Sequence, residues 1–169
     1  PLIVMTPKSL LRHKLAVSSL DELANGSFQL VIGEHRKLTA KKVKRVVLCS
    51  GKVYYDLLED QTKRGQDDVA IIRVEQLYPF PRTLLAAELN KYGKAADVVW
   101  CQEEPMNQGA WFQIRHHLQA CLADGQNLHY AGRPRSPSPA VGHMADHLRE
   151  LQQLLADALV NPFNDQFAE

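Results

Sequence analysis

The sequence of 169 residues is poor in cysteine, and its three cysteines, Cys49, Cys101 and Cys121, lie far apart. It contains no Cys-x-x-Cys pair, so neither a zinc knuckle nor a dithiol redox motif is supported. The count is odd, and Cys49 and Cys101 end apolar runs. This pattern predicts buried free thiols in a reducing compartment rather than disulfides.

Long apolar runs and an excess of one charge are also missing. No apolar run exceeds five residues, whereas a membrane-spanning helix needs roughly 20. The 20 basic and 19 acidic side chains nearly cancel, leaving a net charge of +1. The sequence therefore gives no reason to expect nucleic acid or a membrane as a partner.

What is present is ordinary for a globular domain, with 45% hydrophobic and 23% charged residues. This length suits one domain and can bury a real core. The chain starts with the apolar run Pro1-Leu2-Ile3-Val4-Met5 and has no initiator methionine. We therefore expect a piece of a longer polypeptide that begins within a strand.

Short runs of β-forming residues alternate with helical patterns along the chain. The predicted strands cover residues 2–5, 28–32 (the weakest), 45–49, 69–74, 98–101 and 128–131, and the predicted helices cover 51–63, 81–92, 108–122 and 144–159. The three central runs are apolar at consecutive positions, as in a strand covered on both faces. The pattern predicts an α/β fold, an open and mostly parallel sheet of about five strands with helices on both faces.

We expect a single domain over residues 1–160. Within it, residues 1–45 would hold the lead-in strand, short helices and a basic connector, and residues 161–169 would form a disordered tail. The connector, 36–45, has six basic residues in ten and no interleaved aromatics, which favours a solvated loop. Residues 132–142 contain three prolines and two glycines, so they can form neither a helix nor a central strand.

Ser50-Gly51-Lys52 follows a predicted strand and resembles the end of a phosphate-binding loop. A complete loop needs glycine at position 46 and Ser or Thr at 53, but both positions hold valine. Nucleotide hydrolysis is therefore rejected. A tight turn from strand to helix, in which glycine lets the backbone approach closely, is the better interpretation.

The segment from Thr6 to Arg12 is typical of a helix start, with Thr6 as cap and Pro7 in the first turn. Lys8, Ser9 and Arg12 could together bind a phosphate there. The alternative is capping with solvated basic side chains.

Glu103 and Glu104 end a predicted buried strand, where ligands of α/β proteins usually bind. One could act as a general acid or base if its pKa were raised. Neither has a His or metal partner in the motif, so a structural role is favoured, such as pairing with a neighbouring subunit or capping a helix. Asn107 and Gln108 would shape the same loop.

Arg133 and Arg135 lie beside Ser136 and Ser138 in the proline-rich loop. They could grip a phosphate or a partner's carboxylate, or they could simply be solvated. His143 and His147 have zinc-compatible spacing, but a metalloprotease pattern needs Glu at position 144, which is Met. A solvated helix face is the better interpretation.

Five sequence segments, in this order along the chain, are more specific than the pattern of a generic α/β domain. They are MTPKSLLRH (5–13), CSGKVYYDLL (49–58), DVAIIRVEQLYPFP (68–81), WCQEEPMNQGAW (100–111) and YAGRPRSPSPAVG (130–142). Together they resemble the C-terminal, transketolase-like domain of the bacterial 2-oxoglutarate dehydrogenase family, the thiamine-diphosphate-dependent decarboxylating component of that complex. The resemblance covers nearly the whole chain, except the tail after Leu159.

The resemblance implies a parent oxidoreductase of the tricarboxylic acid cycle that decarboxylates 2-oxoglutarate and succinylates lipoyl groups. It also implies that thiamine diphosphate and magnesium are bound by other domains, since no GDG…N pattern occurs here. We therefore expect no catalytic, cofactor-binding or metal-binding residue in this chain, and no activity of the chain alone.

The resemblance further implies a cytoplasmic protein whose partners are the rest of the parent chain, a homodimer partner and the dihydrolipoyl succinyltransferase. Lys8, Ser9 and Arg12 are the candidates for contact with an acetyl-CoA or nucleotide effector. The interface or loop-shaping candidates are Glu103, Glu104, Asn107, Gln108, Arg133 and Arg135. The alternative function is a stand-alone module that binds a coenzyme A ester or nucleotide. A self-contained hydrolase that uses the paired carboxylates ranks last.

Overall fold

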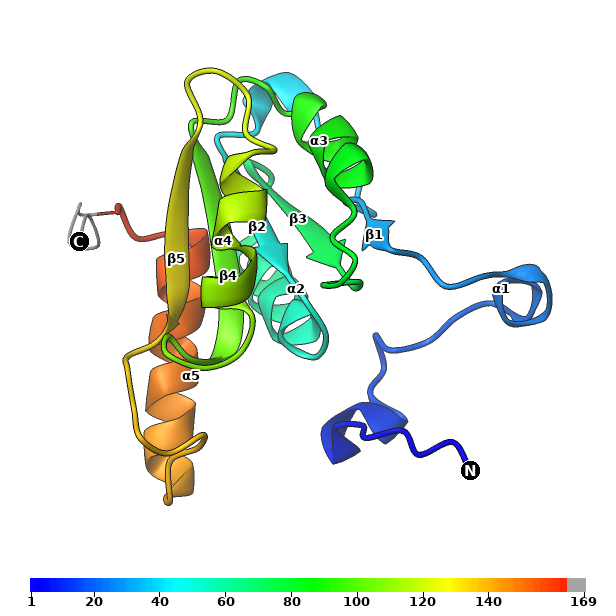
Figure 1. The fold of residues 1–169 in the computed structure, drawn as a ribbon, viewed down its shortest axis with the longest axis vertical. Helices are drawn as coiled ribbons and strands as arrows, with labels where there is room; N and C mark the ends of the chain where they lie inside the picture. The colour runs from blue at the N-terminus through cyan, green and yellow to red at the C-terminus, as the bar shows by residue number, and fades with distance from the viewer. Residues whose placement is uncertain (164–169) are drawn as a thin grey trace.

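The computed structural model describes residues 1–163, and it contains one sheet with helices on both faces (Figure 1). The strands are β1 (Val31–Ile32), β2 (Arg45–Cys49), β3 (Val69–Val74), β4 (Asp97–Pro105) and β5 (Asn127–Arg133). The helices are α1 (Leu20–Asn25), α2 (Val53–Arg64), α3 (Arg82–Asn90), α4 (Trp111–Gln119) and α5 (Met144–Leu159), with 3₁₀ helices η1 (Lys8–Arg12) and η2 (Ala40–Lys42).

The strand order is β1-β3-β2-β4-β5. Strands β2 to β5 are parallel, and among the described strands only the two-residue edge strand β1 is antiparallel. In the middle of the sheet Val47 of β2 faces Ile71 of β3 on one side and Val99 of β4 on the other. The α/β prediction, with about five mostly parallel strands, is confirmed.

Two apolar layers explain why the central strands have consecutive apolar residues. Val46 and Leu48 of β2 pack with α3 and α4 on one face, whereas Val47 and Cys49 pack with α2 and α5 on the other. Because successive side chains of a strand point to opposite faces, covering both faces requires an unbroken apolar run. Trp100 of β4 is the largest fully buried side chain and lies in the first layer.

Residues 1–30, which we call the arm, extend away from the sheet (Figure 1). The predicted strand over residues 2–5 does not form, because no neighbouring strand pairs with it: Leu2 is 90% and Met5 91% exposed. Thr6 does not cap a helix either, since Pro7 precedes η1 and no side chain caps it. Helix α1 does have a capping box, formed by Ser19 and Glu22.

The basic connector is not a simple solvated loop, because its first and last residues are anchored. Arg36 pairs with Glu34 and donates to the carbonyl oxygens of Gln66 and Val69 at 2.9 and 3.1 Å. Arg45 is only 8% exposed. The expectation of a solvated connector was therefore wrong at these two arginines, which meet carbonyl groups that the sequence pattern does not reveal.

Arg45, the first residue of β2, links the end of α5 to the amino end of β4 by hydrogen bonds. It donates to the carbonyl oxygens of Asp157, Ala158 and Asn161 at 3.0–3.4 Å and to the carboxylate of Asp97 at 3.2 Å. Free carbonyls at a helix C-terminus attract cations, so this arginine suits the position.

The ring of Phe163 lies between Arg45 and His129, at 4.4 Å from the guanidinium carbon and 4.2 Å from the His129 ring centroid. The first residues of the expected tail therefore contact the sheet body, and 164–169 lie outside the described residues. Within residues 1–163, no helix is both long and apolar enough to cross a membrane.

Candidate functional site

The helices that follow the neighbouring strands β2 and β4 pack on opposite faces of the sheet. Helix α2, which follows β2, packs in the layer with α5, whereas α4, which follows β4, packs in the layer with α3. The chain therefore separates at the carboxyl ends of these two strands. Such a reversal of strand order is where open α/β sheets usually bind ligands.

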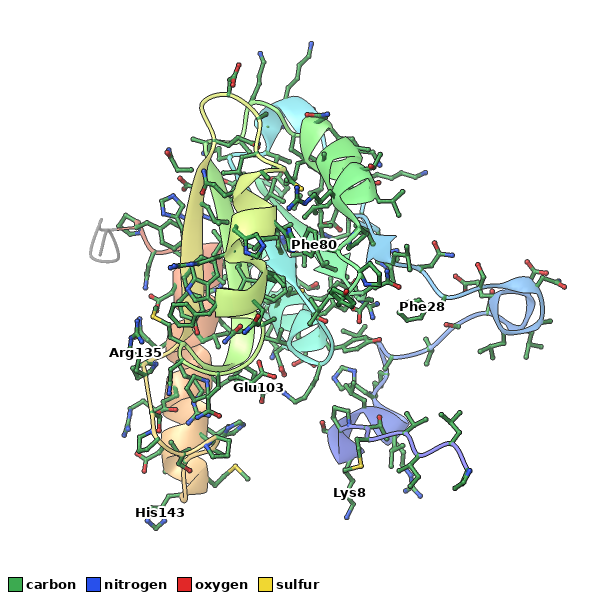
Figure 2. The ribbon with its side chains drawn as sticks, viewed as in Figure 1. Lys8, Phe28, Phe80, Glu103, Arg135 and His143 are labelled. Carbon is green, nitrogen blue, oxygen red and sulfur yellow. The ribbon has the colours of Figure 1, made fainter. Side chains whose placement is uncertain are left out.

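A pocket of about 810 Å³ lies at this point. Its wall comes from the turn after β2, the segment after β3, the end of β4, the start of α4 and the arm. The lining includes Ser50, Gly51, Lys52, Val53, Leu77, Tyr78, Trp100, Gln102, Glu103, Glu104, Gly109, Ala110, Gln113, Ile114, His116, His117 and Pro7. Figure 2 labels Glu103 at this end of the sheet and Lys8 on the arm.

The predicted turn at Ser50-Gly51-Lys52 is present, but its glycine is needed for a different reason. Gly51 has φ 69°, a left-handed conformation that side chains disfavour. A Cβ there would meet no heavy atom within 4 Å, so close approach of the backbone is not the cause. The amide of Gly51 donates to Glu75 at 3.4 Å.

Lys52 is the central charge of the pocket. Its ammonium group contacts the carboxylates of Asp56 at 2.7 Å and Glu103 at 3.3 Å. Burial alone would lower the pKa of Lys52, but the hydrogen bonds and charges of Asp56 and Glu103 raise it above its ordinary value. At neutral pH Lys52 is therefore charged and links α2 to β4 through its two ion pairs, and it does not act as a proton acceptor.

Gln102, a residue that the sequence did not single out, organises the loop after β4. Its Oε1 accepts from the indole N–H of Trp100 at 2.9 Å and from the backbone N–H of Trp111 at 3.0 Å. Its Nε2 donates to three loop carbonyls, the shortest bond being 2.8 Å to Gln108. The side chain is buried and all its bonding capacity is used, so it fixes the loop shape. Its only sequence signal is a polar residue at the end of an apolar run.

Two glycines let this network close. Gly109 has φ 65°, and a Cβ there would come within 3.0 Å of the Gln102 amide. At Gly132, a Cβ would lie 2.2 Å from the hydroxyl of Tyr130 and 3.0 Å from the carbonyl of Gln102. A larger residue at Gly109 would collide with Gln102, and one at Gly132 would collide with Tyr130, at the carboxyl ends of β4 and β5.

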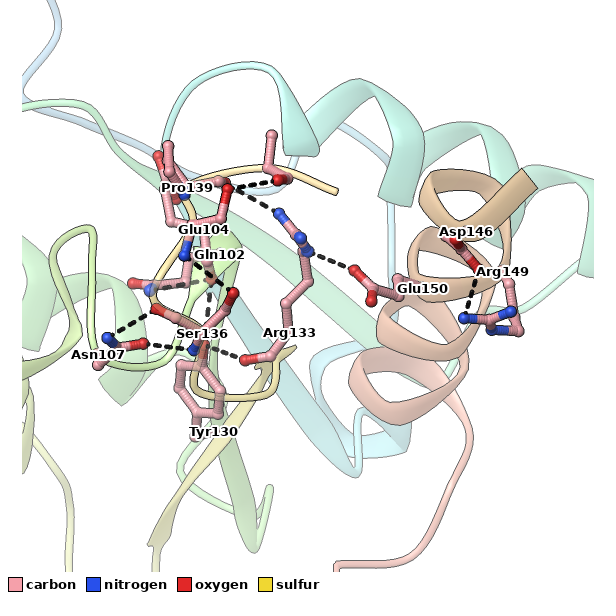
Figure 3. Close-up of polar contacts among 12 residues, drawn as sticks. Gln102, Glu104, Asn107, Tyr130, Arg133, Ser136, Pro139, Asp146, Arg149 and Glu150 are labelled. Atoms are coloured by element: carbon pink, nitrogen blue, oxygen red, sulfur yellow. Dashed lines mark hydrogen bonds and ion pairs between the residues drawn. The ribbon is translucent and has the colours of Figure 1, made fainter. Parts of the chain in front are cut away.

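The interface candidates divide into residues that bind the loops together and residues that do not (Figure 3). Asn107 exchanges two hydrogen bonds with the backbone of Ser136, at 3.0 and 2.9 Å, and Gln108 donates to the same carbonyl at 3.1 Å. Arg133 pairs with Glu150 of α5 and donates to the carbonyl of Pro139 at 3.0 Å. These three residues hold the proline-rich loop against the sheet.

Of the remaining candidates, Glu104 and Arg135 are exposed, whereas Glu103 is half-buried beside Lys52. Glu104 is exposed, and its carboxylate has no ion pair with any residue in 1–163. Arg135 is exposed and lies over the ring of Phe112, 5.2 Å from its centroid. The structure thus brings Glu103 and Glu104 to the pocket, where Glu103 pairs with Lys52.

Lys8, Ser9 and Arg12 line a second hollow of about 670 Å³, between η1 and α2. His13, Lys14 and Glu59 line it as well, and Glu59 already pairs with Lys63 at 3.3 Å. The three predicted residues therefore lie together on one hollow, but the helix that carries them is a five-residue 3₁₀ helix without a side-chain cap.

The three cysteines are free and buried, as predicted. Burial raises the pKa of Cys49 and Cys101, so both remain protonated thiols at neutral pH. Among residues 1–163 no three His, Cys, Asp or Glu side chains are grouped as metal ligands, and this covers His143 and His147.

Comparison with known proteins places the chain in one family. A model of the family described as "2-oxoglutarate dehydrogenase C-terminal" matches residues 17–159. The chain belongs to this family. It is 59% identical over 159 residues to the 2-oxoglutarate dehydrogenase E1 component of Haemophilus influenzae, 57% over 158 residues to that of Cupriavidus necator, and 54% over 161 residues to that of Coxiella burnetii.

Each of these matches covers 94% of this chain but only 17% of the relative. The chain therefore corresponds to about one sixth of such an E1 component. The resemblance read from the five sequence segments is confirmed at the level of the family.

Proposed function

We propose that this chain is the C-terminal domain of a bacterial 2-oxoglutarate dehydrogenase E1 component, and that its own role is assembly rather than chemistry. The supporting observation is the 59% identity to an E1 component over 159 residues. The whole protein decarboxylates 2-oxoglutarate and passes a succinyl group to the lipoyl groups of a dihydrolipoyl succinyltransferase in the bacterial cytoplasm. This chain supplies a folded unit to that protein and to its homodimer.

Thiamine diphosphate supplies the electron sink for such a decarboxylation when it is bound. The side chains of residues 1–163 do not fit this cofactor with its magnesium ion, because they present no group of three or more potential metal ligands. Of the carboxylates in and beside the pocket, Asp56 and Glu103 are already paired with Lys52. We infer that the cofactor is held by other parts of the longer protein.

The surface of the chain supports an assembly role. Its arm exposes large apolar side chains, including Leu2, Met5 and Phe28. Asn107, Gln108 and Arg133 shape the loops, and Glu103, Glu104 and Arg135 stand at the surface beside them. Contiguous exposed apolar side chains are typical of interaction surfaces.

Two measurements test this function. The full polypeptide that carries this chain should decarboxylate 2-oxoglutarate, and removal of residues 17–159 should abolish both activity and the dimer seen by analytical ultracentrifugation. Calorimetry with thiamine diphosphate and magnesium should show binding to the full polypeptide and none to this chain. Micromolar, magnesium-dependent binding to this chain would overturn the assignment.

A second candidate function is recognition of a phosphate-bearing effector, such as a coenzyme A ester or a nucleotide. The observation that favours it is the shared hollow of Lys8, Ser9 and Arg12, which holds four basic or imidazole side chains and one carboxylate. Thermal-shift measurements with acetyl-CoA, AMP and phosphate test it. Stabilisation that is lost in Lys8→Ala supports the site, and no response to any of the three rules it out.

A further inference from the structure

The pocket between β2 and β4 has an apolar lining at an open end of the sheet. Val53, Leu77 and Ile114 lie in its lining, although Val53 and Ile114 are each only 2% exposed, and Ala110 lies at the start of α4. Its volume of about 810 Å³ exceeds that of a single side chain and suits a short loop or a small ligand. The first question is therefore what kind of group would fill it.

The charges around the pocket favour a positively charged occupant. Among residues 1–163, Lys52 is the only Lys or Arg in its lining, and that ammonium group is shared between Asp56 and Glu103. Glu104 adds a further carboxylate that has no ion pair within residues 1–163. The lining thus holds two carboxylates, Glu103 and Glu104, and one lysine that already pairs with Glu103, so the negative charge of Glu104 is left unbalanced beside an apolar surface and attracts a positive group.

His117, which lines the pocket, does not supply that charge. His117 accepts a hydrogen bond from Arg82 at 3.1 Å, and its ring lies 3.9 Å from that of His116. Slight desolvation and the neighbouring His116 and Arg82 lower the pKa of His117, so its ring stays neutral at neutral pH. A cation from outside residues 1–163 is needed to balance Glu104.

The path of the chain indicates where the cation comes from. Pro7 of the arm lines the same pocket, so residue 1 is at most about 21 Å of extended chain from the pocket wall. Residues 2–5 are exposed and contact no part of the described core. Since the relatives are about six times longer than their matched part and the matching family is described as C-terminal, a polypeptide joined before residue 1 would begin within about 21 Å of extended chain from this pocket.

We propose that, in the longer protein, the pocket receives a loop of the polypeptide that precedes residue 1, and that this loop carries an arginine or lysine. The aliphatic stem of that side chain packs against Leu77, and its charged end meets Glu104. The proposal rests on the proposed function, because it requires the longer chain. A second copy of the protein and a small ligand are the competing occupants.

Photo-crosslinking in the full-length protein tests the identity of the occupant. Benzoylphenylalanine replaces Gln113, an exposed residue of α4 that lines the pocket, and in the control it replaces Gln119, an exposed residue of α4 outside the lining. Mixed ¹⁴N and ¹⁵N protein separates crosslinks within a chain from those between chains. We expect a crosslink from position 113 to a peptide upstream of residue 1 in the same chain, at least ten times stronger than from position 119. A crosslink only between chains, or none above the control, overturns the proposal.

A charge substitution tests the cation. Glu104→Lys should repel the docked loop and expose the arm, so trypsin should cleave after Lys8, Arg12 or Lys14 at least fivefold faster in the full-length protein. The control is Asp124→Lys, at an exposed acidic residue that does not line the pocket, which should leave cleavage unchanged. Equal cleavage rates in the two variants contradict the proposal.

Decarboxylation of 2-oxoglutarate by the unsubstituted protein is measured separately. Its absence would refute the proposed function, whereas an active protein without the crosslink refutes only the docking proposal.

Discussion

In the sheet body, residues 31–163, the large apolar side chains of the strands are almost fully buried, whereas in the arm most large apolar side chains are exposed. Leu48 and Ile72 of the body have no exposed surface, but Leu20 and Phe28 of the arm are 85% and 70% exposed. Apolar burial is the main favourable contribution to folding. The body therefore holds the stability of this chain, and the arm adds surface that other parts of a longer protein can cover.

The same contrast holds for polar groups. In the body, Arg45 and Gln102 are buried and hydrogen-bonded at opposite ends of the sheet. In the arm, the side-chain hydrogen bonds are exposed and link residues two to four apart in sequence. Buried networks are costly to break, while exposed local bonds are worth little. Substitutions in the two regions should differ accordingly in their effect on unfolding.

The largest effect is expected for Arg45→Ala. It leaves Asp97 without its arginine and three carbonyl groups at the end of α5 without a donor, so the free energy of unfolding should fall by about 3 kcal/mol. Urea unfolding followed by circular dichroism measures this change. The control is Lys44→Ala, because Lys44 pairs with Asp68 at 3.3 Å but is 82% exposed, and its loss should cost less than about 0.5 kcal/mol. Equal losses in the two variants would contradict the role given to Arg45.

Gln102→Leu should have the next largest effect. The leucine has a similar volume but leaves the indole N–H of Trp100 and the backbone N–H of Trp111 without their acceptor, at a cost of about 2 kcal/mol. These are the two tryptophans of the chain, so their fluorescence should shift to longer wavelength as the loop admits water. Gln119→Leu, at an exposed position of α4, should leave both fluorescence and urea midpoint unchanged. An unshifted spectrum in Gln102→Leu would show that the loop does not depend on this amide.

Gly132→Ala should lower the free energy of unfolding by about 1–2 kcal/mol, because the new methyl group overlaps the hydroxyl of Tyr130. The matched control is Gly142→Ala, where a Cβ would meet no heavy atom within 4 Å. That change should be neutral or slightly stabilising, since alanine restricts the unfolded chain. Thermal unfolding of the two variants gives the comparison, and a loss in Gly142→Ala as large as in Gly132→Ala would rule out the steric explanation.

The fold could be predicted from the sequence because its main signal is the consecutive apolar runs of the central strands. Residues 45–49 and 69–74 were placed with their observed bounds, as was the last helix, 144–159. The predicted strand over residues 2–5 does not form, because local β-propensity cannot show whether a partner strand is present. Helix ends were less accurate: α4 covers Trp111–Gln119 rather than 108–122.

The candidate site was predicted only in part. Glu103 and Glu104 were placed at the pocket by their position after a strand, a rule that follows from topology. Gln102, Arg36 and Arg45 were missed, because their importance comes from carbonyl groups that lie far away in sequence or are presented by the loop geometry. A sequence pattern records side-chain type, whereas these roles depend on which backbone groups the fold leaves unpaired.

The smallest effect is expected in the arm, for Ser19→Ala. The backbone N–H and hydroxyl of Ser19 lower the pKa of Glu22 below its ordinary value of 4.5. A carboxyl with a lowered pKa stabilises the folded helix above the unfolded value, and that stabilisation is lost as the pH falls through the lowered value. In Ser19→Ala the pKa of Glu22, followed by NMR titration, should rise toward 4.5, while Ser18→Ala should leave it unchanged. The urea midpoint of the body should stay the same in both, because α1 has no buried residue. A midpoint that falls as far as in Arg45→Ala would show that arm and body unfold together, and would remove the distinction between them.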